Sequence, residues 1–520
     1  MSEHGKDHPA ARAMGDPAAH MQGFMLFGTI FVLSMANFMA ILDMTIVNVA
    51  VPHIAGSLAV SPNEGTWVIT SYAVAEAITV PLTGWLAGRF GAVRVFYFAA
   101  AGFAVFSMLC GLSNSLAMLI VFRILQGLTG GPLMPMSQTL IMRITPPKHM
   151  QMGLGLWTMT TVLAPIAGPL LGGIIADSAG WPWAFFINVP IGIFCVAMIS
   201  VLLAGRDTPL EEKPVDYVGL ALLIIWVGAL QMMLDNGQDK DWFASPMILG
   251  LCVTSIVGFF AFLIWELTDE HPIVDLKVFR HRGFAAASLA LALTFGSFFA
   301  AVVLIPLWLQ TNMGYTAAWA GYITAYNGAL SLLAAPLVAF LVTRIDPRVL
   351  ISFGLLVLAS TILVRVTFTH DMDSAQLILP QLIQGIGMPF FMIPLIGLTM
   401  EFVLPEETAS AAGLINFLRS ISGAFGTALV TTAWSNASIS SHVDLSGSLN
   451  QPEAVLARLR AFGLSAKQAL AMVDNLVSSQ SLMLGTNNVF FGVGLVVVVA
   501  AASIWLAPKP TGPIHLGTAH

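Results

Sequence analysis

Fourteen long apolar runs dominate this sequence and restrict what the chain can fold into. A helix needs about 20 apolar residues to cross the hydrocarbon core of a bilayer. The runs that reach this length lie at 24–48, 64–88, 93–113, 115–139, 150–176, 182–205, 216–236, 244–267, 283–311, 316–343, 349–369, 375–402, 407–435 and 487–507. They are long and do not alternate in polarity, which is typical of membrane helices and not of barrel strands. We therefore expect an all-α membrane protein with 14 transmembrane helices, numbered here as spans 1 to 14.

The composition fits a chain that lies mostly in lipid. Only 9% of the residues are charged and 57% are hydrophobic, whereas soluble domains carry about 25% charged residues. The net charge of −6 is spread thinly, and no basic tract suggests binding to nucleic acid. The three cysteines lie inside apolar runs, so we interpret them as packing residues and not as disulfides or metal ligands. The polar first ~20 residues hold no apolar stretch ahead of a cleavage site, so no removed signal peptide is predicted.

The 21 lysine and arginine residues predict the orientation of the chain. Short cytoplasmic loops of membrane proteins are enriched in both residue types. With the N-terminus inside, most of them fall on inner loops or tails: Lys6, Arg12, Arg89, Arg94, Arg143, Lys148, Arg206, Lys213, Lys277, Arg280, Arg282, Arg344, Arg348 and Lys509. Lys240 lies on a short outer loop and Arg365 lies near an outer helix end. Arg458, Arg460 and Lys467 fall in the long segment 436–486, and the remaining two, Arg123 and Arg419, lie inside spans. We expect both termini in the cytoplasm.

Three segments recur about 255 to 258 residues downstream in the same order. PLTGWLAGRF, from Pro81, resembles PLVAFLVTRI, from Pro336, and ILQG, ending at Gly127, resembles LIQG, ending at Gly385. A third set matches in the same order: Gly155, Leu156 and Gly168 with Gly413, Leu414 and Gly426. The repeat relates spans 2, 4 and 5 to spans 10, 12 and 13 with unchanged orientation. This pattern indicates a parallel duplication, with substrate binding between the halves near the bilayer midplane.

The duplication predicts how the chain is divided. Residues 24–205 form a six-helix bundle, residues 206–282 hold spans 7 and 8 as an inserted pair with linkers, and residues 283–507 form a second six-helix bundle. The segment 436–486 is predicted as a long outer loop of the second bundle, with enough amphipathic character for a helix pair outside the membrane. Two cytoplasmic tails remain, 1–23 and 508–520.

Charged residues inside the spans are the main candidates for function. A charge at the bilayer centre costs about 2.5–3.5 kcal/mol on insertion scales, so each one needs a physical reason. Asp43, Glu76 and Arg123 lie well inside spans of the first half, and Arg419 lies in span 13 beside Asn416. Proton relays and counter-charges for cargo are common uses of such residues.

The two acids have different sequence surroundings. Asp43 lies toward the outer end of span 1, near Thr45 and Asn48. Glu76 lies deeper, and at helical spacing it shares a face with three polar residues of span 2: Tyr72, Thr79 and Thr83. Desolvation favours the neutral carboxyl group, so such an acid can hold a proton and release it to water or to a cationic substrate. The alternative is a static structural role, for instance a salt bridge to Arg123.

Arg123 is followed one helical turn later by Gln126. A guanidinium group stays charged, so it must find acceptors inside the membrane, either as part of coupling or as a structural pair. In span 5, Pro165 and Pro169 flank Gly168, a pattern that favours a kinked and closely packed helix. At the inner end of span 2, the segment GWLAGRFGAVR, from Gly84, forms a tight basic turn that contains Arg89, Gly91 and Arg94. This turn either latches helices on the cytoplasmic side or only follows the charge rule.

Five motifs, taken in order, resemble one transporter family. They are ILDMTIVNVAVP from Ile41, GWLAGRFGAVR from Gly84, FRILQG from Phe122, APIAGPLLGG from Ala164 and WPWAFFINVPIG from Trp181. Together they are similar to the signatures of the fourteen-span drug:proton antiporters of the major facilitator superfamily, and most of all to the EmrB-type branch. The resemblance extends over nearly the whole chain.

This resemblance implies the major facilitator fold and a proton-driven multidrug exporter of the bacterial inner membrane, active against hydrophobic toxic compounds and antibiotics. It implies partners as well: a periplasmic membrane-fusion adaptor and an outer-membrane channel, which complete a tripartite efflux pump. The proton gradient is the driving force, and no cofactor or metal is implied. The resemblance assigns Asp43 to the acid of the first-span motif, Arg123 to the buried arginine of span 4, and Gly168 with Pro169 to the antiporter motif of span 5.

The sequence departs from the family pattern at two places. Gly88 stands where an Asp usually precedes the first Arg of the span 2–3 loop, which puts a charge-relay latch there in doubt. Pro182 replaces the Arg of a Trp-Arg-Trp signature in span 6. Glu76 is outside the general signature, so its role depends on the physical argument alone.

Other classes of protein fit less well. The sequence has no HExxH, GxSxG or Walker motif and no histidine deep in a span, so neither an intramembrane enzyme nor an ATP-driven pump is predicted. A channel or scaffold does not account for both the parallel repeat and the buried charges. The main alternative is a narrow-specificity, proton-coupled exporter of one endogenous metabolite.

Overall fold

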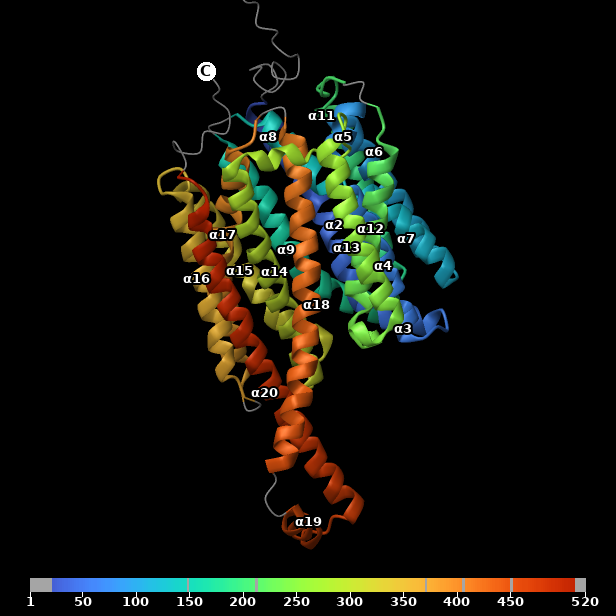
Figure 1. Ribbon diagram of the computed structural model, residues 1–520, viewed down its shortest axis with the longest axis vertical. Helices are drawn as coiled ribbons and strands as arrows, with labels where there is room; N and C mark the ends of the chain where they lie inside the picture. Colours follow the sequence, from blue (N-terminus) through green and yellow to red (C-terminus); the bar gives the residue numbers. More distant parts are fainter. Residues whose placement is uncertain are drawn as a thin grey trace, which may run out of the picture.

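The structure, a computed structural model, describes residues 21–146, 149–210, 214–369, 372–404, 407–448 and 452–509. Within these residues every regular element is a helix, and most helices run side by side in one bundle (Figure 1). The first half contains α2 (Gly23–Ser57), α3 (Pro62–Gly65), α4 (Trp67–Thr79), α5 (Thr83–Phe90), α6 (Ala92–Gly111), α7 (Leu116–Gly130), α8 (Leu133–Ile144), α9 (Met150–Ser178), α10 (Trp183–Phe186) and α11 (Asn188–Leu202).

The inserted pair is α12 (Tyr217–Asn236) and α13 (Pro246–Thr268). The second half contains α14 (Arg282–Thr311), α15 (Ala317–Leu341), α16 (Pro347–Val364), α17 (Ser374–Glu401), α18 (Thr408–Ser448), α19 (Pro452–Ala461) and α20 (Ala466–Ser503). Short 3-10 turns lie at η3 (Gln238–Lys240), η4 (Trp242–Ala244), η5 (Leu276–Arg280), η6 (Arg365–Thr367) and η8 (Ile504–Leu506).

These helices coincide with the fourteen predicted spans. Among the described residues, 12 helices are long and apolar enough to cross a membrane. The other two predicted spans coincide with the interrupted pair α4–α5 and with α9, which has 29 residues. Spans 2 and 4 each break beside a proline, Pro81 and Pro132, because proline has no N–H to donate and its ring clashes with the preceding turn.

Corresponding helices of the internal repeat cross each other in the same way, at corresponding glycines. A methyl group added to Gly127 would meet the backbone carbonyl of Tyr72, and one added to Gly385 would meet that of Asn327. These two glycines correspond in the repeat, so spans 2 and 4 approach each other as spans 10 and 12 do. Glycine is needed at both crossings because a side chain would push the backbones apart.

The two halves meet through corresponding helices. α9 of span 5 packs against α15 of span 10, and α18 of span 13 packs against α5 of span 2 and α8 of span 4. The repeat relates span 2 to span 10 and span 5 to span 13. The contact between spans 5 and 10 therefore corresponds to the contact between spans 13 and 2. This is the interface expected for two halves related by a pseudo-two-fold axis along the membrane normal.

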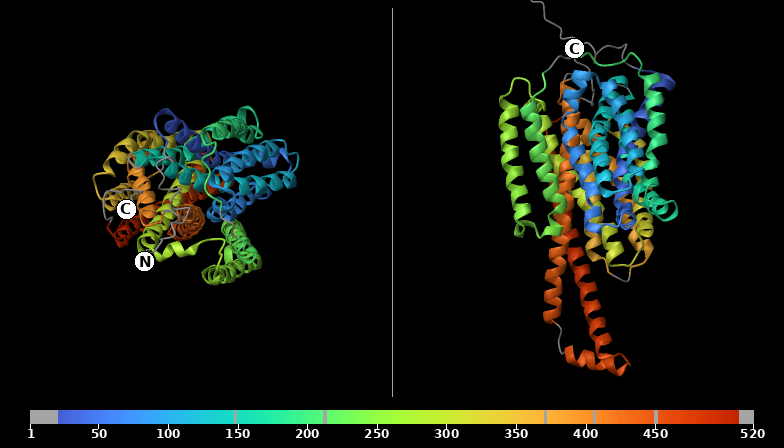
Figure 2. Two further views of the ribbon diagram at one scale, coloured as in Figure 1. Left: turned by 90° about the horizontal axis from the view of Figure 1, so that it is seen from above. Right: turned by 90° about the vertical axis from the view of Figure 1, so that its right-hand side faces the viewer.

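The inserted pair lies at the edge of the bundle. α12 packs against α4 and α18, and Trp226 meets Phe417 of α18 with ring centroids 5.8 Å apart. α13 lies outside α12 and leaves most of its apolar side chains exposed, as a lipid-facing helix does (Figure 2). Because α12 contacts both halves, the pair can follow the movement of either one.

The segment 436–486, predicted as an outer loop with the character of a helix pair, is helical in most of its described parts. α18 continues the helix of span 13 to Ser448, and α20 begins at Ala466 and runs on into span 14. The prediction stopped where hydropathy fell, but a helix needs only the absence of breakers, and α18 contains no proline. At 1.5 Å per residue the 41 residues of α18 extend for about 60 Å, twice the hydrocarbon thickness.

The described residues of 436–486, with α19 at their tip, therefore form a helical projection that we call the stalk (Figure 1). We call this side of the bundle the stalk end. The opposite side, where Met21 bonds to the carbonyl of Ile144, is the terminal end.

Candidate coupling and substrate site

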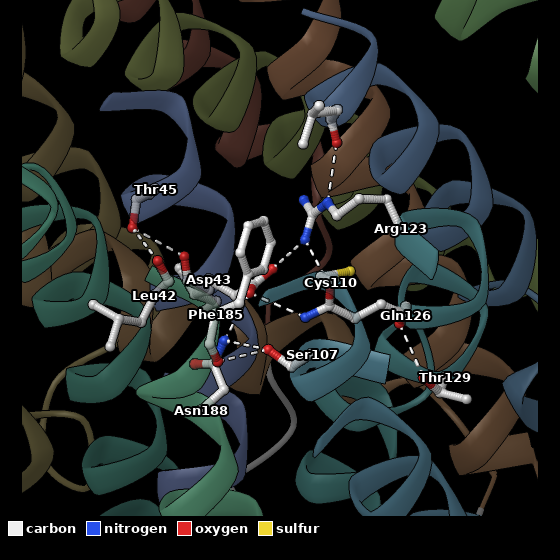
Figure 3. Close-up of polar contacts among 12 residues, drawn as sticks. Leu42, Asp43, Thr45, Ser107, Cys110, Arg123, Gln126, Thr129, Phe185 and Asn188 are labelled. Atoms are coloured by element: carbon white, nitrogen blue, oxygen red, sulfur yellow. Dashed lines mark hydrogen bonds and ion pairs between the residues drawn. The ribbon is translucent and has the colours of Figure 1, made fainter. Parts of the chain in front are cut away.

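Asp43 is the centre of a buried polar network in the first half (Figure 3). Its Oδ2 accepts a hydrogen bond from Arg123 Nη1 at 2.6 Å. Its Oδ1 accepts from Gln126 Nε2 at 3.0 Å and from Asn188 Nδ2 at 2.7 Å. Asp43 is fully buried, so these donors replace the water that an ionised carboxylate loses. Spans 1, 4 and 6 are thereby joined at a single side chain.

Arg123 is also buried, and its guanidinium group donates several hydrogen bonds. Besides Asp43, it donates from Nε to the carbonyl of Val68 at 3.0 Å and from Nη1 to Gln126 Oε1 at 2.9 Å. The guanidinium also lies over the ring of Tyr72, 4.1 Å from its centroid. Span 2 thus enters the network through a backbone carbonyl and an aromatic face. Sequence reasoning placed Asp43, Arg123, Gln126 and Tyr72 in the site, and the structure brings these four together.

The network extends to two residues that the sequence analysis did not single out. Asn188 donates to Ser107 Oγ at 3.0 Å, and Ser107 donates to the carbonyl of Phe185 at 2.9 Å. Ser107 brings span 3 into the network. The only signal in the sequence was a polar residue inside a long apolar run, and Asn188 also lies within the WPWAFFINVPIG motif.

Glu76 lies outside this network. It is half-buried in α4, and its carboxylate has no hydrogen bond or ion pair with any described residue. The strongest cationic influence on it is Arg419 of α18, in the other half, followed by Arg123. Arg419 is only 5% exposed, forms no ion pair among the described residues, and lies 5.7 Å from the ring centroid of Phe295. Glu76 and Arg419 are therefore near enough to interact electrostatically across the interface between the halves, without forming an ion pair.

The position of these charges follows from the crossing of spans 2 and 13. These helices run antiparallel and are closest where Gly413 approaches the carbonyl of Val80 and where Gly84 approaches Ser410. With a rise of 1.5 Å per residue, Glu76 and Arg419 lie roughly 6 and 9 Å from the Gly413 crossing, both toward the stalk end. A buried hydrogen bond of 3.1 Å from Asn416 to Gln138 joins the halves at a similar level. The halves are closed at the terminal end, with a polar layer just beyond the closure.

Three other predicted polar residues do not join the Asp43 network. Thr45 donates to carbonyls of its own helix and lies 3.3 Å from the carbonyl of Ala164, where Gly168 of span 5 crosses span 1. Thr79 likewise bonds to backbone carbonyls, including that of Gly127 at 3.4 Å. Asn48 is exposed. The side chains of Pro165 and Pro169 lie outside the described residues.

The basic turn at the inner end of span 2 receives its acid from another segment. Gly91 precedes α6 with φ +91°, and the carboxylate of Asp207, in the linker after span 6, occupies the space beside it. Asp207 Oδ1 accepts from the N–H of Val93 at 3.0 Å, and its Oδ2 lies 3.3 Å from Arg94 Nε. Arg143 holds the same linker through the carbonyls of residues 206 and 207. Gly84 packs on α18 and Arg89 is half-buried at the end of α5.

The second half shows the same arrangement with its acid in place. Asp346, which corresponds to Gly91 in the repeat, caps α16 by accepting from the N–H of Arg348 at 3.0 Å. The hydrogen bonds from Arg348 hold the pKa of Asp346 below its ordinary value. In the first half Asp207 therefore acts as the missing cap. Although Gly88 stands where the family usually has an acid, the turn still has a carboxylate partner. This partner is Asp207, which comes from a distant part of the chain.

Groups of His, Cys, Asp and Glu large enough to bind a metal ion do not occur among the described residues. The family can now be assigned. The model of the Major Facilitator Superfamily matches residues 33–427. The chain is a member of the Major Facilitator Superfamily. The expected fold, and with it the membrane-spanning architecture, is confirmed.

Relatives of this superfamily member show which branch it resembles. It is 41% identical over 497 residues to the multidrug export protein EmrB of Escherichia coli, with 95% of this chain and 97% of that protein covered. It is 42% identical over 501 residues to the fatty acid resistance protein FarB of Neisseria gonorrhoeae, with 96% and 98% covered. The predicted resemblance to the EmrB type is confirmed.

A solved structure supports the fold independently. The human organic anion transporter MFSD10 (TETRAN) superimposes with a TM-score of 0.56 at 14% identity, covering 93% of this chain and 100% of that one. At this identity the likeness concerns only the arrangement of helices. The family match and the similarity to EmrB show that the chain is a multi-pass membrane transporter of the superfamily.

Proposed function

We propose that this transporter exports hydrophobic toxic compounds by alternating access in exchange for protons. The relatives named as multidrug export and fatty acid resistance proteins support the direction of transport and the class of cargo. The observation that carries the proton coupling is the unpaired Glu76, which faces Arg419 across the interface between the halves. Protons are the driving ion in this proposal, and no cofactor takes part.

The position of Glu76 makes the closure of the two halves depend on its charge. Ionised Glu76 attracts Arg419 and so holds spans 2 and 13 together next to the Gly413 crossing. A proton that reaches Glu76 from the stalk end removes this attraction, and the terminal end is then free to open. Coupled exchange requires that protonation comes before the opening of the terminal end. If the empty, unprotonated carrier could change its conformation, transport would not be coupled to the proton. A substrate that binds in the opened state displaces the proton and allows the return.

The Asp43 network has a different role in this scheme. Asp43 and Arg123 satisfy each other and bind Gln126 and Asn188 at the centre of the first half. This geometry supports a structural role in which the five spans that the network joins, spans 1, 2, 3, 4 and 6, move as one rigid body. Of the two acids, Glu76 is therefore the proposed proton carrier, and Asp43 positions the helices around it.

The stalk supports a partner outside the membrane. We propose that the terminal end lies in the cytoplasm and the stalk in the periplasm of a bacterial cell, an orientation that the distribution of Lys and Arg supports. Large apolar side chains on the stalk face solvent: Val443 is 65% exposed, Phe462 87% and Leu470 60%. Exposed apolar patches outside the membrane are typical of protein interfaces. We propose that the stalk binds a periplasmic membrane-fusion adaptor, which leads to an outer-membrane channel in a tripartite pump.

The test of proton exchange uses purified protein in liposomes, with internal pH followed as a lipophilic cationic dye is offered. Wild type is compared with Glu76→Gln, Asp43→Asn and a matched control, Glu270→Gln, whose carboxylate is exposed at the end of span 8. We expect the dye to drive proton movement in wild type and control but not in Glu76→Gln. If no toxic compound moves protons in the wild type, a dedicated metabolite exporter replaces this proposal.

A second candidate cargo is favoured by Arg419. Its guanidinium lies beside the Phe295 ring without a carboxylate partner, an arrangement that suits the head and chain of an amphipathic carboxylate. The relative FarB carries the name of a fatty acid resistance protein. Because fatty acids carry protons across bilayers unaided, this cargo is tested by fatty acid sensitivity of cells that express wild type or Arg419→Gln. Loss of protection only against carboxylates supports this cargo, and equal loss against cationic dyes contradicts it.

A further inference from the structure

The inserted pair contains a second acidic site, separate from Glu76 and Asp43. Asp216 is the residue before the first turn of α12, and Glu266 lies in the last turn of α13. The two helices are antiparallel neighbours, so both acids lie at the base of this hairpin, at the terminal end. Neither residue belongs to the interface between the halves.

The Asp216 carboxylate is held in a fixed orientation. Its Oδ1 accepts from the N–H of Gly219 at 2.8 Å, which caps α12. The indole N–H of Trp265 donates to both oxygens, at 3.0 Å each. Asp216 therefore joins the start of α12 to the end of α13 and cannot turn away from its neighbour.

Glu266 lies next to it and is fully buried. Its Oε2 accepts from the N–H of Val274 at 3.2 Å, where the following linker folds back. Its Oε1 is buried and has no hydrogen-bond partner among the described residues. A buried ionised oxygen without a donor is expensive, because the water it gave up is not replaced.

The two carboxylates point at the same place. A methyl group added to Gly219 would overlap both Asp216 Oδ2 and Glu266 Oε1. The unpartnered oxygen of Glu266 and an oxygen of Asp216 therefore converge on the same space beside Gly219. The charged groups that act on Glu266 are Asp216 and Asp269, both acidic. No Lys, Arg or His of the described residues forms an ion pair with Asp216 or Glu266.

We propose that Asp216 and Glu266 form a proton-binding site in which a neutral Glu266 donates a hydrogen bond from Oε1 to the Asp216 carboxylate. The ionised pair has two unfavourable features: Glu266 Oε1 has no hydrogen bond, and the two negative charges repel each other. One proton on Glu266 removes both, because it makes Oε1 a hydrogen-bond donor and neutralises one of the charges. Every carboxylate oxygen then has a hydrogen-bond partner. Glu266 Oε2 accepts from the N–H of Val274, and Asp216 Oδ1 accepts from the N–H of Gly219. The shared proton joins Glu266 Oε1 to Asp216 Oδ2, which also accepts from Trp265. Two carboxylates that share one proton are a known arrangement in proteins.

The bound cation is a proton and not a metal ion. Mg²⁺ and Ca²⁺ require six or more oxygen ligands in all, and Mg²⁺ retains several of its waters. Here two oxygens converge, and Glu266 is fully buried, so water cannot complete a coordination shell. The N–H groups that surround the site would also face a cation with their positive ends. A proton needs only the two oxygens that are present.

This proton is structural, so it binds but does not travel. It joins α12, α13 and the linker that leads to the second half, at a distance from the exchange path. Measurements of proton binding at equilibrium should therefore count one proton more than measurements of transport. Since the folded protein binds a proton that the unfolded chain releases at neutral pH, this site makes the folded state less stable as pH rises.

Full-length protein in nanodiscs provides the test. Infrared difference spectra, recorded between neutral and alkaline pH, should show a protonated carboxyl C=O band that is lost in Glu266→Gln and retained in Glu270→Gln, the exposed acid one turn further on. Glutamine keeps the pattern, because its NH₂ donates to Asp216 and its oxygen accepts from Val274. We expect Glu266→Gln to fold and export cargo like wild type, with a weaker fall of its unfolding temperature between pH 6 and 9.

Two results would overturn the proposal. One is a carboxyl band and a pH slope of unfolding that are the same in wild type and Glu266→Gln. The other is a shift of the wild-type unfolding temperature by Mg²⁺ or Ca²⁺ that EDTA reverses and Glu266→Gln abolishes, which would make this a metal site. If Glu266→Gln fails to fold, Asp216→Asn replaces it, because its amide can donate to an ionised Glu266 and the carboxyl band should again be absent.

Discussion

At the scale of single residues, buried charges in this protein follow two patterns. Asp43 and Arg123 form an ion pair and each makes further hydrogen bonds, whereas Glu76 and Arg419 are half-buried and buried, respectively, and form no ion pair among the described residues. A satisfied pair is inexpensive to keep and difficult to change. An unsatisfied pair across a movable interface responds to a proton. The difference between structural and functional charge therefore lies in the partners and not in the residue type.

Removing one member of the satisfied pair should destabilise the first half. Arg123→Gln leaves the Asp43 charge buried with only amide donors, and we expect a cost of about 3–5 kcal/mol. The double variant Asp43→Asn with Arg123→Gln should cost less than the sum of the single changes, because neither charge remains. Thermal unfolding in detergent measures both effects. Additive costs would show that the two residues do not depend on each other.

The close helix crossings make a second prediction at this scale. Gly127→Ala and Gly385→Ala each place a methyl group against a backbone carbonyl of a neighbouring span, and we expect each to cost about 1–3 kcal/mol. Gly492→Ala, which meets no atom within 4 Å, is the control and should be neutral or slightly stabilising, because alanine favours a helix. Unfolding temperatures of the three variants decide the matter. Equal values would mean that the crossings are not tight.

At the scale of elements, linkers supply contacts that the helices lack. Gly91 precedes α6 and has no side chain to cap it, and Asp207 from the linker after span 6 provides the acceptor. In the second half Asp346 caps α16 directly. The duplicated turns thus reach the same chemistry by different routes. The first route also fixes the linker to the first half.

Loss of the borrowed cap should weaken the start of α6 and release the linker. Asp207→Ala removes the acceptor for Val93, and we expect a cost of about 0.5–2 kcal/mol, typical of a lost helix cap. Limited proteolysis in the linker should become faster, while Asp239→Ala, an exposed acid on η3, leaves the rate unchanged. An unchanged cleavage rate in Asp207→Ala would show that the other contacts of the linker, from Arg143 and through Thr208, are enough to hold it.

At the scale of the whole molecule, two six-helix halves close at the terminal end and the stalk projects from the other. The contacts between span 2 and span 13 and between span 5 and span 10 correspond through the repeat. An interface built from two equivalent contacts can rock without losing both at once. The inserted pair contacts both halves through α12, and its linkers tie it to each of them.

The stalk should be dispensable for folding but not for assembly. Phe462→Ser together with Leu470→Ser removes two exposed apolar side chains and leaves the bundle untouched. We expect an unchanged unfolding temperature and loss of copurification with the periplasmic adaptor expressed alongside. Gln480→Ser, an exposed polar position of α20, serves as the control. Retained copurification in the double variant would place the adaptor contact elsewhere.

The sequence by itself determined the spans, the repeat and most of the inner network. Spans follow from hydropathy summed over about 20 neighbouring residues, which needs no knowledge of the rest of the chain. Asp43, Arg123, Gln126 and Tyr72 were found because a polar group deep in a span is rare and costly. The full length of α18 and α20 was missed, because hydropathy detects where the bilayer ends and not where a helix ends.

Which of these groups meet depends on how the helices pack, and no local pattern in the sequence predicts it. That Asp43 pairs with Arg123 while Glu76 faces Arg419 depends on how each helix is rotated and where spans 2 and 13 cross. Asn188, Ser107 and Asp207 were missed for the same reason, since their partners are far away in sequence. Burial is largely a property of a segment, but pairing is a property of the relative position of two segments. Burial can therefore be predicted from local composition, whereas pairing is established only when the helices pack against one another.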